Sequence, residues 1–139
     1  MFDHEKLKVF FRDEIRDFKD ANVSIANSGL LYGLGVFTGM RAHYNENEKK
    51  VFIFRPDAHF KRFSFSCKLL RYDVFLEKYD YNKFLKVIKD LIQINKIKED
   101  VYIRISNFSD ENKITPKLVG YKDVLSAFLY PLENYVPTE

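Results

Sequence analysis

Two arginine-containing motifs in this sequence have the residue types and the spacing to bind anions. The first, His59-Phe-Lys-Arg62, would place an imidazole and a guanidinium on one face of a helix. The second, Tyr102-Ile-Arg104, would place a phenol and a guanidinium on one face of a strand. A guanidinium presents a planar fork of N–H donors that matches phosphate and carboxylate oxygens. From spacing alone, an ordinary solvated helix face is the favoured interpretation of the first motif, and Arg104 could equally pair with a carboxylate of the protein.

A glycine-rich segment is the other candidate for a ligand site. From Gly29 to Arg41 it reads Gly-Leu-Leu-Tyr-Gly-Leu-Gly-Val-Phe-Thr-Gly-Met-Arg. Glycines let the backbone turn sharply or let a ligand approach closely. From Val36 onward two sets of side chains alternate, which predicts a strand with two different faces. Gly39 lies between Phe37 and Arg41 on one face, so we expect the floor of a pocket there; a tight turn leading into a core strand is the simpler alternative.

Hydrophobic periodicity and capping residues predict the elements that must position these motifs. A hairpin over 7–16 turns at Arg12-Asp13, and further strands are expected at 36–44, 51–54, 101–108 and 124–130. One helix should begin at Pro56 and run to about residue 70, and a second should begin near Asp80 or Asn82. The expected fold class is therefore α+β, with an antiparallel sheet built from hairpins and two helices packed on one face.

Composition limits the function classes that this chain can serve. It has 139 residues and a formal net charge of +3, from 23 Lys and Arg against 20 Asp and Glu, so no nucleic-acid footprint is expected. The single cysteine, Cys67, excludes an internal disulfide, and the three scattered histidines predict no metal site. The sequence shows no apolar run of the length that a signal peptide or a membrane span needs. We expect a cytoplasmic protein that binds neither nucleic acid nor membrane.

The glycine-rich segment resembles the early signature of the fold-type IV pyridoxal-phosphate enzymes, "Gly-Leu-x-Tyr-Gly-x-Gly-Val-Phe-Glu-Gly-x-Arg", with Thr38 in place of the usual acid. This class holds branched-chain aminotransferases, D-amino-acid aminotransferases and aminodeoxychorismate lyases. His59-Phe-Lys-Arg62 is similar to the "His-x-x-Arg-Leu" of the class, and Tyr102-Ile-Arg104 to the "Tyr-Ile-Arg-Pro" of branched-chain aminotransferases. D-amino-acid enzymes tend to carry tyrosine and lysine at positions 37 and 41, so the branched-chain type fits better. The resemblance runs from about residue 7 to residue 130.

The resemblance implies pyridoxal 5'-phosphate as the cofactor and Arg62 as the residue that binds its phosphate. It further implies that Arg104 binds the distal carboxylate of glutamate or 2-oxoglutarate. The residues expected to shape the substrate pocket are Tyr32, Phe37, Gly39 and Tyr102, and in dimers of this class the equivalent of Tyr32 can reach the neighbouring subunit's site. Structural roles are expected for His59 and Arg41.

The resemblance also implies what this chain lacks. In the class, the lysine that forms a Schiff base with the cofactor lies in a C-terminal domain, and no lysine here falls in a matching position. We therefore expect residues 1–130 to be the small N-terminal domain of a homodimeric branched-chain aminotransferase, residues 131–139 to begin the interdomain linker, and the chain alone to be inactive. The alternatives are an aminodeoxychorismate lyase of the same fold and a non-catalytic binding or dimerisation domain.

Overall fold

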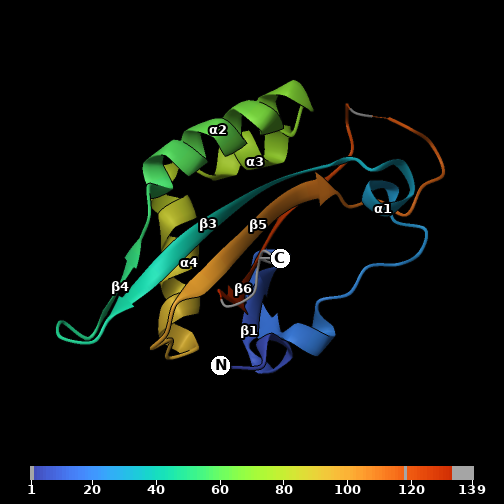
Figure 1. Cartoon of the computed structure of the whole chain (residues 1–139). Coiled ribbons are helices and arrows are strands. Elements are labelled where there is room, and N and C mark those ends of the chain that lie inside the picture. The colour runs from blue at the N-terminus through green and yellow to red at the C-terminus, as the bar shows by residue number, and fades with distance from the viewer. Residues whose placement is uncertain (1, 118, 133–139) are drawn as a thin grey trace, which may run out of the picture.

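Six antiparallel strands form one sheet in the order β2-β1-β6-β5-β3-β4 (Figure 1). The computed structural model describes residues 2–117 and 119–132. The strands are β1 (Lys8–Phe11), β2 (Glu14–Asp17), β3 (Gly35–Asn45), β4 (Lys50–Ile53), β5 (Val101–Ser109) and β6 (Asp123–Pro131). The helices are α1 (Ser28–Tyr32), α2 (Pro56–Leu69), α3 (Asp73–Lys78) and α4 (Tyr81–Ile94), with short 3-10 turns η1 (His4–Lys6) and η2 (Phe18–Asp20).

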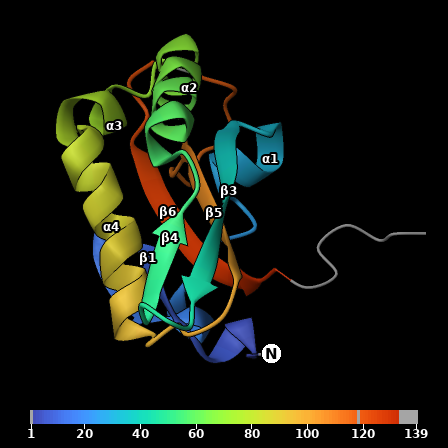
Figure 2. The same ribbon diagram turned by 60° about the vertical axis from the view of Figure 1, so that its left-hand side comes forward.

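Three helices, α2, α3 and α4, cover one face of the sheet (Figure 2). Alternation along the central strands directs their apolar side chains to this covered face, where Met40, Ala42, Ile103 and Ile105 are at most 1 % exposed. The amphipathic helix α4 lies across the strands and buries Phe84 and other apolar residues of its inner stripe. The expected α+β class and the antiparallel sheet are confirmed, and the core lies between the sheet and these helices.

The structure adds two short helices, α1 and α3, to the two that were expected on one face of the sheet. The expected helices correspond to α2 and α4, and Asp80 caps α4 by accepting a hydrogen bond from the Lys83 N–H at 2.8 Å. Helices α1 and α3 were not expected, because five and six residues are too few to show helical periodicity. Their stability comes from caps and packing, which act across the fold and leave little trace in a short segment.

The first hairpin turns through two non-glycine residues in the left-handed region, Arg12 with φ 50° and Asp13 with φ 63°. This conformation matches the twist of a two-residue hairpin but is costly for side chains with a Cβ. Partners outside the turn hold it in place: Arg12 donates two hydrogen bonds to Asp110, at 2.7 and 2.9 Å, and Asp13 accepts one from Tyr79 at 2.8 Å. The hairpin expected at this turn is confirmed.

A buried carboxylate, Asp123, joins the sheet to helix α3. It is 3 % exposed and accepts hydrogen bonds from the N–H groups of Val74 and Phe75, at 3.1 and 3.0 Å, and from the Asn107 side chain at 2.8 Å. The negative charge lies at the N-terminus of α3, where the free N–H groups point. Asp123 thereby fixes α3, and with it the far end of α2, against β6.

Strand β6 continues through Pro131, the residue at which the linker was expected to begin. Most of that expected linker, residues 133–139, lies outside the described residues. Within the described ranges, no helix has both the length and the apolar character needed to cross a membrane.

We expect Asp123→Ala to lower the free energy of unfolding by about 2–4 kcal/mol, because it leaves three donors, two of them buried, without an acceptor. Urea denaturation followed by circular dichroism measures the change. The matched control is Asp90→Ala, which removes an exposed i,i+4 ion pair with Lys86 and should cost less than about 1 kcal/mol. Equal effects of the two substitutions would contradict the anchoring role of Asp123.

Candidate functional site

The uncovered face of the sheet brings together four of the residues that the sequence singled out. Phe37 and Gly39 come from β3, and Tyr102 and Arg104 from the adjacent strand β5, where Arg104 lies opposite Gly39. The Arg104 guanidinium stacks on the Phe37 ring, with its carbon 3.6 Å from the ring centroid, and its Nη1 donates a hydrogen bond to the Tyr102 hydroxyl at 3.3 Å. The result is a cationic group held between two aromatic side chains.

Gly39 is required by the position of the Tyr102 ring. A Cβ built at residue 39 would overlap the phenol ring and hydroxyl of Tyr102. The ring therefore lies flat against the β3 backbone, and Tyr102 is only 8 % exposed although its strand face is uncovered. Phe37, by contrast, is 58 % exposed, so one wall of this cluster is open to a ligand.

Arg104 has no carboxylate partner in the described ranges, 2–117 and 119–132, at ion-pairing distance. Among the described residues, its guanidinium contacts the Phe37 ring and the Tyr102 hydroxyl. A partly buried guanidinium without a counter-ion favours the binding of an anion from outside. The protein carboxylate that the sequence allowed as an alternative partner is therefore not present among these residues.

A second cationic group lies on the opposite side of β3, beneath α2. Arg62 Nη2 donates a hydrogen bond to the Thr38 hydroxyl at 2.9 Å, and the same hydroxyl lies 2.9 Å from His59 Nδ1. Thr38 is fully buried, whereas Arg62 is exposed. Burial lowers the pKa of His59 below its ordinary value, and the positive charges of Arg62 and Arg55 lower it further. The imidazole is therefore neutral at pH 7, and the group presents one guanidinium charge.

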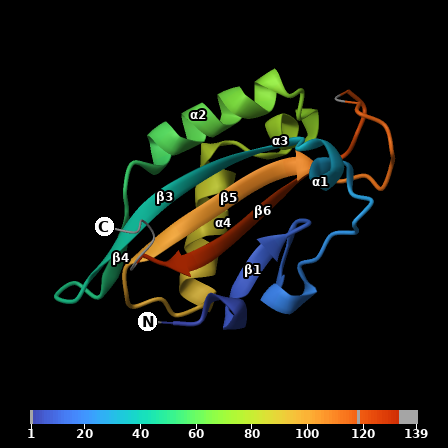
Figure 3. The same cartoon turned by 45° about the vertical axis from the view of Figure 1, so that its right-hand side comes forward.

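Arg62 and Arg104 contact side chains on opposite faces of β3, Thr38 for the first and Phe37 for the second. Strand β4 pairs with β3 at residues 42–45 alone, so the outer edge of β3 over 35–40 has no paired strand in the described structure. Helix α2 runs alongside this edge (Figures 1 and 3).

Two other residues from the sequence analysis lie apart from these groups. Tyr32 ends α1, at the end of the sheet where β3 begins. Helix α1 is capped at both ends: the Asn27 side chain accepts a hydrogen bond from the Leu30 N–H at 3.2 Å, and Gly33 follows the helix with φ 63°. Arg41 is exposed on the uncovered face, and its backbone oxygen accepts a hydrogen bond from the Phe54 N–H at 2.9 Å.

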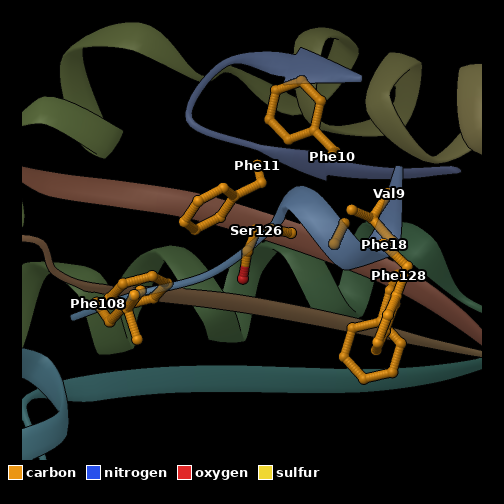
Figure 4. Close-up of a pocket in the computed structure, with 10 residues that line it drawn as sticks. Val9, Phe10, Phe11, Phe18, Phe108, Ser126 and Phe128 are labelled. Carbon is orange, nitrogen blue, oxygen red and sulfur yellow. The ribbon is translucent and has the colours of Figure 1, made fainter. Parts of the chain in front are cut away.

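An apolar cleft of about 260 Å³ lies further along the uncovered face, beneath η2 (Figure 4). Phe11 and Phe108 stack with centroids 6.4 Å apart, and Phe18 meets Phe128 edge-on at 6.3 Å. Ser126 supplies the only side-chain polar atom of its lining. The cleft therefore has no donor set for a phosphate. Its lining residues are Val9, Phe10, Phe11, Phe18, Ala21, Val23, Phe108, Ser126, Ala127 and Phe128.

Other chemistry has little support in the described part of the chain. No group of three or more His, Cys, Asp or Glu side chains is arranged there to hold a metal ion. Cys67 is fully buried, and burial raises the pKa of its thiol well above the ordinary value, so it remains protonated and unreactive. The two arginine-centred groups are thus the candidate site.

Comparison with known proteins identifies the class to which this fold belongs. No protein-family model matches the chain. The chain is 31% identical over 131 residues to a probable branched-chain-amino-acid aminotransferase of Aquifex aeolicus. This match covers 94% of the chain and 41% of the relative. The branched-chain amino acid aminotransferase of Escherichia coli superposes with a TM-score of 0.84 at 24% identity, over 96% of this chain and 42% of that one. The enzyme of Thermobaculum terrenum, solved in its PLP form, superposes with a TM-score of 0.80 at 21% identity, over 93% and 41%.

The chain therefore has the fold of the N-terminal domain of the fold-type IV pyridoxal-phosphate enzymes. Within that class it is related to the branched-chain aminotransferases. It spans about two-fifths of the length of these relatives. The sequence analysis named Arg62, Phe37, Gly39, Tyr102 and Arg104 but gave Thr38 no role. Strand alternation was the available signal, since it places Thr38 on the face opposite Phe37 and toward α2.

The lowered pKa of His59 predicts a pH dependence of stability. The unfolded chain takes up a proton near the ordinary histidine value of 6.5, before the folded chain does, so the free energy of unfolding should fall as pH drops below that value. Carboxylates with lowered pKa values, such as Asp13 and Asp100, lose their contribution only below about pH 3.8 and do not affect this window.

Urea denaturation at about pH 7.5 and about pH 5 measures this loss. We expect His59→Asn, which cannot be protonated, to flatten the dependence between the two pH values. An unchanged dependence in the variant would contradict the assignment to His59.

Proposed function

We propose that this chain is the N-terminal domain of a pyridoxal-phosphate-dependent aminotransferase that moves an amino group from branched-chain amino acids to 2-oxoglutarate. The observation that carries the proposal is the Arg104 guanidinium, stacked on Phe37 on the uncovered face without a carboxylate partner among the described residues. The relationship to branched-chain aminotransferases supplies the reaction class. In this function Arg104 binds the distal carboxylate of 2-oxoglutarate, and Phe37 contacts the carbon chain of the substrate.

Arg62 fits the phosphate of the cofactor. Its guanidinium is exposed, has no carboxylate partner in the described ranges, and lies beside a neutral imidazole and a hydroxyl. The remaining guanidinium N–H donors are suited to a phosphate, and the two uncharged neighbours leave the positive charge available to it. When bound, pyridoxal phosphate supplies the electron sink that amino-group transfer requires. Arg62 holds the phosphate on one side of the β3 edge, while the substrate groups act on the other.

Tyr102 and Gly39 position Arg104 in this function. The Tyr102 ring occupies the space that a side chain at residue 39 would need, and its hydroxyl accepts the Arg104 hydrogen bond that orients the guanidinium. The side chains of Tyr102 and Arg104 are thus fixed by their neighbours before the substrate arrives, which reduces the entropy lost on binding.

The catalytic lysine and the rest of the pocket belong, in this proposal, to a C-terminal domain that follows residues 1–130. The chain spans about two-fifths of its relatives, which leaves room for such a domain in the parent protein. We expect the chain alone to bind neither substrate tightly and to turn over none.

We further propose a cytoplasmic homodimer in which Tyr32 of α1 reaches the partner subunit's site. In support, α1 presents two exposed apolar side chains next to Tyr32: Leu30 is 61 % exposed and Leu31 is 45 % exposed. Apolar side chains clustered on a short surface helix are typical of a contact surface.

The lyase alternative shares the cofactor site but needs no second-substrate arginine. Arg104, held ready for a carboxylate on the open face, favours the transaminase. A binding or dimerisation domain without catalysis would not require Arg62 and Arg104 to be left without carboxylate partners.

In the protein that contains this chain, we expect Arg62→Ala to weaken the retention of pyridoxal phosphate by about 10- to 100-fold, through the loss of charge-assisted hydrogen bonds to the phosphate. Absorbance of the bound cofactor after extensive dialysis measures retention. The matched control is Arg41→Ala, which removes an equally exposed arginine from the uncovered face and should retain the cofactor. Equal retention in the two variants would refute the phosphate assignment.

We expect Arg104→Leu to raise the KM for 2-oxoglutarate by at least about 10-fold, because its distal carboxylate loses a guanidinium partner. The KM for a branched-chain 2-oxo acid, which has no distal carboxylate, should change little in the same variant. Steady-state kinetics with both acceptors in the parent protein make the comparison. A parallel loss for both acceptors would show that Arg104 supports the fold of the pocket and does not select the substrate.

A further inference from the structure

We propose that Thr38 is a positioning residue that orients Arg62 toward a phosphate through a hydroxyl shared with His59. This inference rests on the proposed role of Arg62 and goes beyond it, because it assigns a task to two residues that do not touch the ligand themselves. Its basis is the Arg62–Thr38–His59 chain of contacts, with both separations equal to 2.9 Å.

The direction of these hydrogen bonds follows from the atoms available. A guanidinium has donors only, so Arg62 Nη2 donates to Thr38 Oγ1. The hydroxyl has a single proton of its own, and the positioning role assigns that proton to the contact with His59 Nδ1, 2.9 Å away. In this assignment His59 carries its proton on Nε2, and the lone pair on Nδ1 fixes the rotation of the hydroxyl.

The Thr38 hydroxyl is held rigidly because it is buried, whereas a hydroxyl on the surface could rotate. Thr38 is 0 % exposed, and its β-branched side chain on a strand has few allowed rotamers. His59 is held by α2, whose first turn begins at Pro56. Arg62 lies on that same helix, one turn further on, so the hydroxyl fixes one end of a guanidinium whose remaining N–H groups stay exposed.

The hydroxyl also leaves the charge of Arg62 uncompensated. A carboxylate at this position would form an ion pair with the guanidinium and oppose a second anion, whereas Thr38 is neutral. Thr38 therefore orients Arg62 and keeps its full positive charge available to the phosphate.

The variants Thr38→Val and Thr38→Ser test the inference. Valine keeps the shape of threonine without the hydroxyl, whereas serine keeps the hydroxyl. In the protein that contains this chain, we expect Thr38→Val to weaken the binding of pyridoxal phosphate by about 5- to 10-fold, as for the loss of one hydrogen bond. Thr38→Ser should restore most of the affinity. The binding of pyridoxal, which lacks the phosphate, should be the same in all three proteins.

A double-mutant cycle separates this inference from the proposed function. If Thr38 acts through Arg62, Thr38→Val should have no further effect on affinity in an Arg62→Ala background. A full additional loss there would overturn the positioning role. If Arg62→Ala alone left affinity for pyridoxal phosphate unchanged, the phosphate assignment itself would fail, whatever the behaviour of Thr38.

A measurement without cofactor tests the hydrogen-bond direction. Nitrogen-15 NMR of the His59 ring in this chain should show the Nε2–H tautomer in the wild type and in Thr38→Ser, and a mixture of tautomers in Thr38→Val. A predominant Nδ1–H tautomer in the wild type would contradict the direction of the hydrogen bonds. If Thr38→Val unfolds the chain, which circular dichroism would reveal, Thr38→Ala replaces it, and the serine comparison remains decisive.

Discussion

The alternation of side chains along one strand, β3, determines where every functional group of this domain can lie. Phe37 and Gly39 point to the uncovered face, and Thr38 between them points to the helices. Each set has a partner on another element: Arg104 of β5 for the first and Arg62 of α2 for the second. The two arginines are thus attached to neighbouring residues of one strand but separated by the thickness of a sheet.

The covered face makes this division stable. Helices α2, α3 and α4 pack on the apolar sides of β3, β5 and β6, and the buried Asp123 fastens the start of α3 to the sheet. Because α2 is held by this core, the position of Arg62 is set by packing that lies well away from it. The uncovered face has no such support, and there the aromatic rings of Phe37 and Tyr102 hold Arg104 directly.

The sequence predicted the strands and the two long helices because each repeats a pattern over enough residues to be recognised. It also predicted that Tyr102 and Arg104 share one face of a strand, because that prediction requires only the alternation of side chains. The contact between Arg62 and Thr38 was beyond it, since their spacing along the chain says nothing about how α2 crosses β3. The flat packing of Tyr102 on Gly39 was equally hidden, because it joins two strands that are far apart in sequence.

The short length of β4 also affects how readily the domain can aggregate. Among the described residues, the edge of β3 over 35–40 has no neighbouring strand. Such an edge can pair with a strand of another chain and so promote aggregation. The exposed Phe37 side chain lies beside this edge, and its burial would favour association with another chain. Charge works against this outcome: Arg62 and Arg41 lie near the same edge, and two copies that approached it would bring like charges together. Repulsion between these arginines would therefore oppose pairing of two copies at the edge of β3, a surface separate from the α1 contact proposed for the dimer.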